Sequence, residues 1–87
     1  MDANAQLERV IEAAEQLGLA VRYEPLGGDG GGLCRIRGQN VLFVDTLADA
    51  PTRLERSLEA LARVPGIEDH YLRPDLRERI EYIRRDR

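Results

Sequence analysis

Five of the chain's eight glycines fall within one six-residue segment, Gly27-Gly28-Asp29-Gly30-Gly31-Gly32. Glycine backbones adopt the left-handed conformations in which successive N–H groups converge on an anion. Phosphate-binding loops, however, usually join a strand to a helix and add a lysine and a hydroxyl. This segment runs into a predicted strand without either, so a flexible or tightly curved strand connection is the alternative interpretation. The candidate donors to a ligand are the amides of Gly28, Gly30, Gly31 and Gly32.

Two arginines follow the glycines and complete this candidate site. Arg35 and Arg37 alternate with Cys34 and Ile36, so both guanidinium groups emerge on the same face of a strand. If helices cover the Cys34/Ile36 face, the arginines lie on the open face of the sheet. There they can bind a carboxylate or phosphate through paired hydrogen bonds. The other interpretation is a solvated strand face on which acids such as Asp45 balance the arginines.

No other set of residues forms a recognisable catalytic group. Cys34 is the only cysteine and His70 the only histidine, and sequence distance leaves open whether they meet. A lone cysteine in a strand is typically a small core residue, and a loop histidine typically caps a helix or bonds a carbonyl. The only serine, Ser57, lies within a predicted helix without triad partners. We therefore expect no catalytic residue, no metal ligand and no cofactor, and the inventory excludes disulfide frameworks and zinc fingers.

The charge balance limits the classes of partner. All 13 basic residues are arginines, and the net charge is −3, the wrong sign for holding nucleic acid over the whole surface. No apolar run approaches the roughly 18 residues that span a bilayer, and the start does not resemble a signal peptide. We expect a soluble bacterial cytoplasmic protein that contacts no membrane. Nucleic-acid binding is disfavoured because acids are interleaved with its basic C-terminal residues, which are Arg77, Arg84, Arg85 and Arg87.

Apolar spacing predicts the elements that position these residues. An amphipathic stripe predicts a first helix that begins after Asp2 or Asn4 and ends before Gly18. Alternating or apolar runs predict strands at 19–24, 33–37 and 41–45. A tight turn at 37–40 makes the last two strands antiparallel, and the continuous apolar run makes the third strand central. Two further helices follow, one capped by Asp49 and one that begins at Pro74.

The resulting order is α-β-β-β-α-α, which indicates a single α+β domain over residues 1–87. We expect a small three-stranded, mainly antiparallel sheet with helices packed on one face. So small a domain leaves much surface uncovered. We therefore predict a non-enzymatic binding protein that recognises a partner protein or its own copy, through an uncovered sheet face or the Tyr71–Ile83 region with Tyr82. The alternative is an anion-binding, ligand-binding or catalytic domain centred on the Gly27–Gly32 loop with Arg35, Arg37 and Asp45.

Three sequence motifs resemble a group of small conserved bacterial proteins that has no established activity. Their pattern is GGxCRxxG, then LFVD, then YLxPxLRE, and here it covers about residues 27–78. The resemblance therefore implies a relationship and no mechanism. A more distant topological likeness is to ImmA/IrrE-type metallopeptidase domains, whose helix carries HExxH. Only Glu59 matches that motif, because Leu58 and Ala62 replace both histidines, so the likeness implies no zinc hydrolysis.

Overall fold

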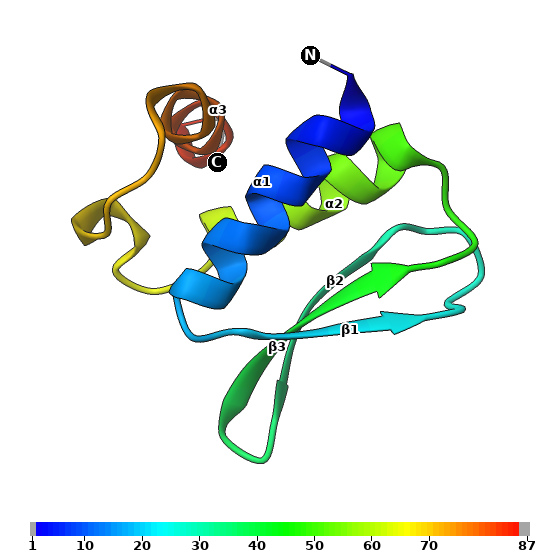
Figure 1. Ribbon diagram of the computed structural model, residues 1–87. Coiled ribbons are helices and arrows are strands. Elements are labelled where there is room, and N and C mark those ends of the chain that lie inside the picture. The colour runs from blue at the N-terminus through cyan, green and yellow to red at the C-terminus, as the bar shows by residue number, and fades with distance from the viewer. Residues whose placement is uncertain (1, 86–87) are drawn as a thin grey trace.

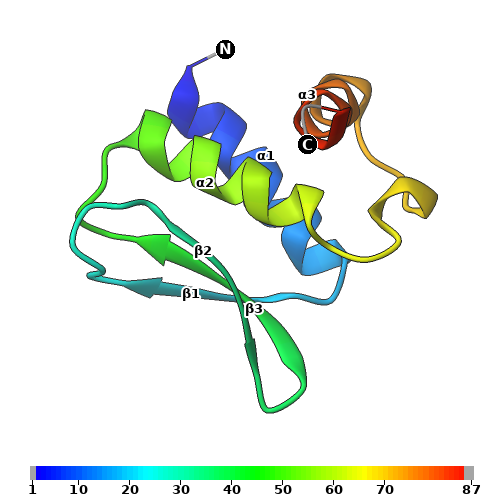
Figure 2. The ribbon, with the colours of Figure 1, turned by 180° about the vertical axis from the view of Figure 1, so that it is seen from behind.

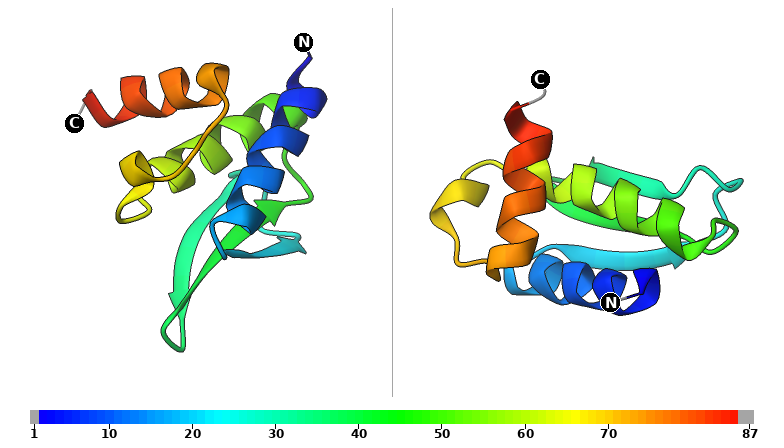
Figure 3. Two further views of the ribbon diagram at one scale, coloured as in Figure 1. Left: turned by 60° about the vertical axis from the view of Figure 1, so that its left-hand side comes forward. Right: turned by 90° about the horizontal axis from the view of Figure 1, so that it is seen from above.

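The elements follow one another in the predicted order. The computed structural model describes residues 2–85. Helices α1 and α2 pack on one face of the sheet, and α3 crosses them on the side away from it (Figures 1 and 3). The predicted α+β class is confirmed. The elements are α1 (Ala3–Gln16), β1 (Ala20–Glu24), β2 (Gly31–Ile36), β3 (Gln39–Asp45), α2 (Ala50–Ala62), the 3-10 helix η1 (Ile67–Asp69) and α3 (Pro74–Arg85).

The sheet is mixed, with strand order β1-β3-β2. Strand β3 is central, as its apolar sequence predicts, and it pairs antiparallel with β2. It pairs parallel with β1, because the loop after β1 carries the chain past the end of β3 before β2 returns on the other side. This loop contains the glycine cluster and is seen from behind in Figure 2. The glycines therefore bridge the two edge strands across the end of the central strand.

The hairpin turn is shorter than the sequence predicts. Arg37 and Gly38 have φ angles of 51° and 82°, as a two-residue type I′ turn requires. The flanking residues Ile36 and Gln39 face each other across the hairpin. Gln39 and Asn40, which we expected in the turn, therefore belong to β3. Arg37 belongs to the turn and not to the strand face that Arg35 occupies.

Helix starts and ends follow the predicted capping residues. The Asp2 carboxylate accepts a hydrogen bond from the Ala5 amide at 2.8 Å, so it caps α1 in preference to Asn4. Asp49 caps α2 by accepting from the Thr52 amide at 2.9 Å. Gly18 follows α1 with a φ of 86°. Of the basic C-terminal residues named from the sequence, Arg87 lies outside the described residues.

One apolar core joins the layers. Leu42 and Val44 of β3 and Leu58 and Leu61 of α2 are completely buried within it, together with Val10 of α1. Helix α3 adds Leu76 and Ile80 to the same core. Within residues 2–85, no helix is both long and apolar enough to cross a membrane.

Ser57 is the exception in this core. It is completely buried in α2, and its hydroxyl has no hydrogen-bond partner among the described residues. Because a buried hydroxyl without a partner costs free energy and alanine is the better helix former, Ser57→Ala should raise the free energy of unfolding by about 0.5–1 kcal/mol. Urea denaturation measures the change. A loss of stability in the alanine variant would contradict the unsatisfied state of this hydroxyl.

Candidate functional site

The glycine loop is built around the carboxylate of Asp45. This residue ends β3 and is completely buried. Its Oδ1 accepts hydrogen bonds from the amides of Leu26 and Leu47, both at 2.9 Å. Its Oδ2 accepts from the amides of Gly28 at 2.6 Å and Gly30 at 3.2 Å. The converging N–H groups that the sequence suggests for an external anion are thus directed at one of the protein's own side chains.

These four donors keep Asp45 charged. Burial raises the pKa of Asp45, but the hydrogen bonds from Leu26, Leu47, Gly30 and Gly28 outweigh it and lower the pKa to about 2. The carboxylate is therefore ionised at neutral pH. It serves as a permanent internal anion for the loop amides.

The lowered pKa predicts how stability depends on pH. The folded pKa of about 2 lies below the ordinary value of 3.8, so the unfolded chain takes up this proton first as the pH falls. The contribution of Asp45 is complete above about pH 4 and should be lost as the pH falls toward 2. Thermal unfolding of the wild type and of Asp45→Asn between pH 6 and 2 isolates this contribution. The variant should show the shallower fall in Tm, and parallel curves would contradict the assignment.

The glycines permit the backbone path of the loop. Gly28, Gly30 and Gly31 have φ angles of 95°, 97° and 94°, which L side chains rarely adopt. A Cβ on Gly30 would collide with the Arg56 side chain, and a Cβ on Gly31 would collide with the Phe43 carbonyl. The fold therefore requires glycine at these positions. This agrees with the interpretation of the segment as a tightly curved connection between strands.

The two arginines lie away from the loop amides. Arg35 is four residues beyond Gly31 in an extended strand, about 13 Å along β2. It shares the helix-covered side of the sheet with Leu33, which packs against the core. The expected faces are therefore reversed, because Leu33 is the β2 residue that meets the helices. Gly28, Gly30 and Asp45 come together, whereas Arg35 and the turn residue Arg37 do not join them.

Cys34 and His70 do not form a pair. Cys34 is exposed, so the expectation of a small core residue is wrong. His70 is exposed after η1, where its amide donates to the Ile67 carbonyl and its carbonyl accepts from Arg77. No hydrogen bond joins Cys34 to His70 in the described part of the chain. Across residues 2–85, no three Cys, His, Asp or Glu side chains cluster as metal ligands.

A groove between β2 and α2 is the feature that sequence reasoning missed. Its volume is about 240 Å³. Arg56 is anchored there by a 2.8 Å hydrogen bond to the Asp29 carbonyl and a 3.0 Å ion pair with Glu59. The sequence signal that could have indicated this groove has two parts. One is the Gly31-Gly32 pair at the start of β2, and the other is the polar residues Arg56 and Glu59 at helical spacing in α2. The groove is lined by Gly31, Gly32, Leu33, Arg56, Glu59, Ala60 and Arg63.

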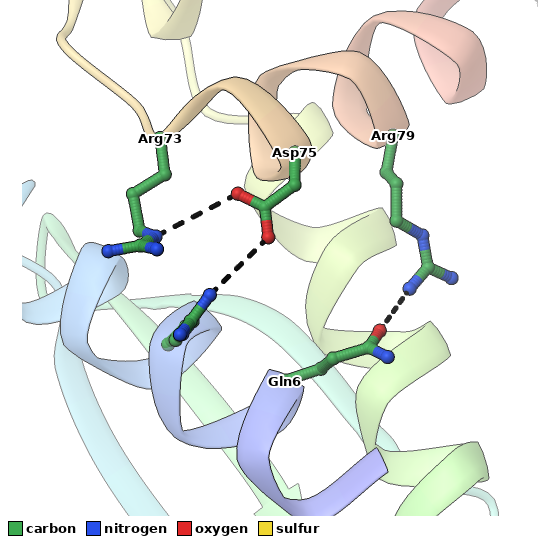
Figure 4. Close-up of polar contacts among 5 residues, drawn as sticks. Gln6, Arg73, Asp75 and Arg79 are labelled. Atoms are coloured by element: carbon green, nitrogen blue, oxygen red, sulfur yellow. Dashed lines mark hydrogen bonds and ion pairs between the residues drawn. The ribbon is translucent and has the colours of Figure 1, made fainter. Parts of the chain in front are cut away.

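A second polar cluster connects α3 to α1. Asp75 pairs with Arg73 at 3.8 Å and with Arg9 at 3.6 Å, and Arg79 donates to Gln6 at 2.8 Å (Figure 4). The pairs to Asp75 are long and solvent-exposed, so they contribute little stability. These contacts orient α3 across the other two helices.

The tyrosines of the predicted Tyr71–Ile83 patch do not combine into one surface. Tyr71 is 82% exposed and lines a groove with Arg9 and Arg73, whereas Tyr82 is 65% exposed beside Glu55 and Glu78. Each tyrosine is thus isolated among charged groups.

No helix within residues 2–85 covers the second face of the sheet (Figures 1 and 2). Val41 and Asp45 of β3 alternate onto this face and are buried, and the glycine loop closes over Asp45. Phe43 of β3 lies on this face, with the Arg22 guanidinium 5.4 Å from its ring centroid. Ile36, 40% exposed, and Cys34 belong to the same face at the β2 edge. Apolar side chains, a strand edge and the α2 groove therefore lie next to one another.

Comparison of this chain with protein-family models, with curated proteins and with solved structures found no match.

Proposed function

We propose that this chain is a small non-enzymatic binding protein of the bacterial cytoplasm, and that it recognises another protein chain through the β2 side of its sheet. The observation that carries the proposal is the position of β2. It is an edge strand, it borders an uncovered sheet face, and it lines a groove with α2. Backbone hydrogen-bonding groups and apolar side chains are thus available at the same place.

The register determines which backbone groups of β2 are available. Residues of an antiparallel pair alternate between bonded and non-bonded positions. The type I′ turn makes Ile36 and Gln39 a bonded pair, and the Asp45 amide donates to the Gly30 carbonyl at 3.4 Å at the other end. Even-numbered residues of β2 therefore bond to β3. The N–H and C=O groups directed outward belong to Gly31, Leu33 and Arg35.

This edge carries few of the features that usually prevent strand pairing. Edge strands in monomeric proteins are commonly protected by charged side chains, proline, bulges or very short length. Strand β2 has six residues, no proline and no bulge, and Arg35 is its one charged residue. Gly31 and Gly32 leave its first third without side chains. Such an edge supports recognition of a partner strand.

The alternative, an anion-binding site in the glycine loop, has less support. The amides of Gly28 and Gly30 already donate to the ionised Asp45 carboxylate. An external anion would have to displace that buried charge, and Arg35 and Arg37 are too far along the chain to assist. No observation favours catalysis at this loop.

Photo-crosslinking from Cys34 tests the proposed function. Cys34 is the only cysteine and lies exposed beside the β2 edge, so a maleimide–benzophenone probe labels this one site. In cells of the source organism, the labelled protein should form a discrete adduct whose mass distinguishes a second copy from another protein. The control carries Cys34→Ala and Glu78→Cys, which moves the probe to an exposed position on α3. Absence of a discrete adduct, or the same adducts from both sites, would contradict the proposal.

A further inference from the structure

We infer that the groove between β2 and α2 binds an acidic segment of a partner protein, in extended conformation, as a fourth strand beside β2. This inference rests on the proposed function and specifies the chemistry of the partner. It is carried by three observations: the outward backbone groups of β2, the row of side chains that α2 places over that edge, and the sign of their charge.

The backbone of β2 provides the pairing surface. Gly31, Leu33 and Arg35 direct N–H and C=O groups away from β3, which is enough for a ladder with a short extended peptide. Gly31 and Gly32 carry no side chains, so a peptide backbone can approach β2 closely at its glycine end. A Cβ built on Gly32 meets nothing within 4 Å, so the sheet face beside this end of β2 is open as well.

Helix α2 forms the wall of the groove. Arg56 and Glu59 of α2 and Arg63, the residue that caps its C-terminal end, follow one another at helical spacing along the groove, and Ala60 leaves room between them. The groove has a volume of about 240 Å³, which gives space for side chains of alternate residues of an added strand. The site thus combines backbone pairing on one side with side-chain contacts on the other, as strand-addition sites do.

The charges in the groove select an acidic ligand. Arg56 and Arg63 line it, and Arg35 lies on the same side of the sheet just beyond Leu33, whereas Glu59 is the one acid in the lining. Arg35 and Arg63 form no hydrogen bond or ion pair with any residue from 2 to 85 that would neutralise them. This surface is positive although the whole chain carries a net charge of −3. Carboxylates along an extended peptide complement it.

The same charges argue against a second copy as the occupant. Pairing β2 with β2 of another copy would bring two sets of these arginines together and place two α2 helices over one narrow junction. Like charges brought together at an interface are unfavourable. An acidic segment avoids both problems, because it brings the opposite charge and no helix.

The test uses the intact, 15N-labelled protein and blocked peptides of defined sequence. The probe is EVEVEVE, and the control of opposite charge is KVKVKVK. We expect EVEVEVE to cause saturable shifts at the amides of Gly31, Leu33 and Arg35, and KVKVKVK to bind at least about tenfold more weakly. Shifts centred elsewhere, equal binding of both peptides, or no saturable shift would overturn the inference.

Matched variants separate charge from backbone pairing. Arg63→Glu should weaken EVEVEVE binding at least about tenfold, whereas Arg85→Glu, an exposed arginine at the end of α3, should not. Arg35→Pro removes an outward N–H at an edge position that tolerates proline, and it should weaken binding more than Arg35→Ala. If Arg35→Pro does not fold, the Arg63→Glu and Arg85→Glu pair decides. Equal binding by that pair would overturn the inference.

Failure of this inference is distinguishable from failure of the proposed function. A discrete Cys34 adduct together with no peptide binding at the β2 edge would overturn the acidic strand alone. If the Cys34 adduct has the mass of two copies and does not form in the Leu33→Pro variant, the occupant of the β2 edge is a second copy. That result would also overturn the inference of an acidic segment. Absence of any Cys34 adduct would count against the proposed function itself.

Discussion

Replacing Gly31 with alanine should lower the free energy of unfolding by roughly 3 kcal/mol or more. The φ angle of 94° at Gly31 disfavours any L side chain, and its Cβ would collide with the carbonyl of Phe43. That carbonyl belongs to the central strand, so it cannot move aside without disturbing the pairing with both neighbours. Urea denaturation followed by circular dichroism measures the effect.

Gly32→Ala is the control for this substitution. It changes the next residue of the same strand, and a Cβ there meets nothing within 4 Å. Its φ angle of 156° also strains an L side chain, but no collision adds to that strain, so the expected loss is smaller, about 1 kcal/mol. Equal losses for the two variants would show that the close approach of Gly31 to β3 does not determine the backbone path.

Asp45→Asn should lower Tm by roughly 10 °C or more, the second large effect that we expect. An asparagine side chain has one acceptor oxygen where the carboxylate has two. Its NH₂ group would face either the amides of Gly28 and Gly30 or those of Leu26 and Leu47. Two partly or fully buried donors would then lose their acceptor, and the internal charge of the loop would be gone. Thermal unfolding at pH 7 gives the shift.

Asp29→Asn provides the matched control in the same loop. Asp29 is exposed, and it contacts Arg56 through its backbone carbonyl, which accepts a hydrogen bond from the guanidinium. Removing its charge should change Tm by less than about 2 °C. If Asp29→Asn and Asp45→Asn behaved alike, the loop would not depend on the Asp45 carboxylate.

The sequence was sufficient to predict the helices and the central strand. Asp2 and Asp49 indicate helix starts because a short side chain with an acceptor oxygen, directly before an amphipathic stripe, can bond a free N–H group of the first turn. The run 41–44 predicts a strand between two others because both of its faces carry apolar side chains. These signals are local, and local geometry is what sequence patterns report.

The parts that could not be predicted depend on contacts between distant residues. Alternation places Leu33 and Arg35 on one face of β2 and Cys34 and Ile36 on the other. Because each face carries an apolar residue, the pattern alone does not say which face meets the helices. Likewise, Asp45 can be taken from sequence as a partner for arginines. Only the path of the loop over the end of β3 brings four backbone donors to its carboxylate. The groove was missed because it depends on where α2 lies beside β2.

Titration of the 15N-labelled protein with inorganic phosphate tests the central claim most directly, namely that the glycine loop is closed around Asp45 and that ligands are recognised at the β2 edge. The amide resonances of Gly28 and Gly30 should not move in a saturable way with phosphate, while those of Gly31, Leu33 and Arg35 respond to the acidic peptide. Saturable phosphate shifts at Gly28 and Gly30 would contradict the claim and identify the loop as an anion-binding site.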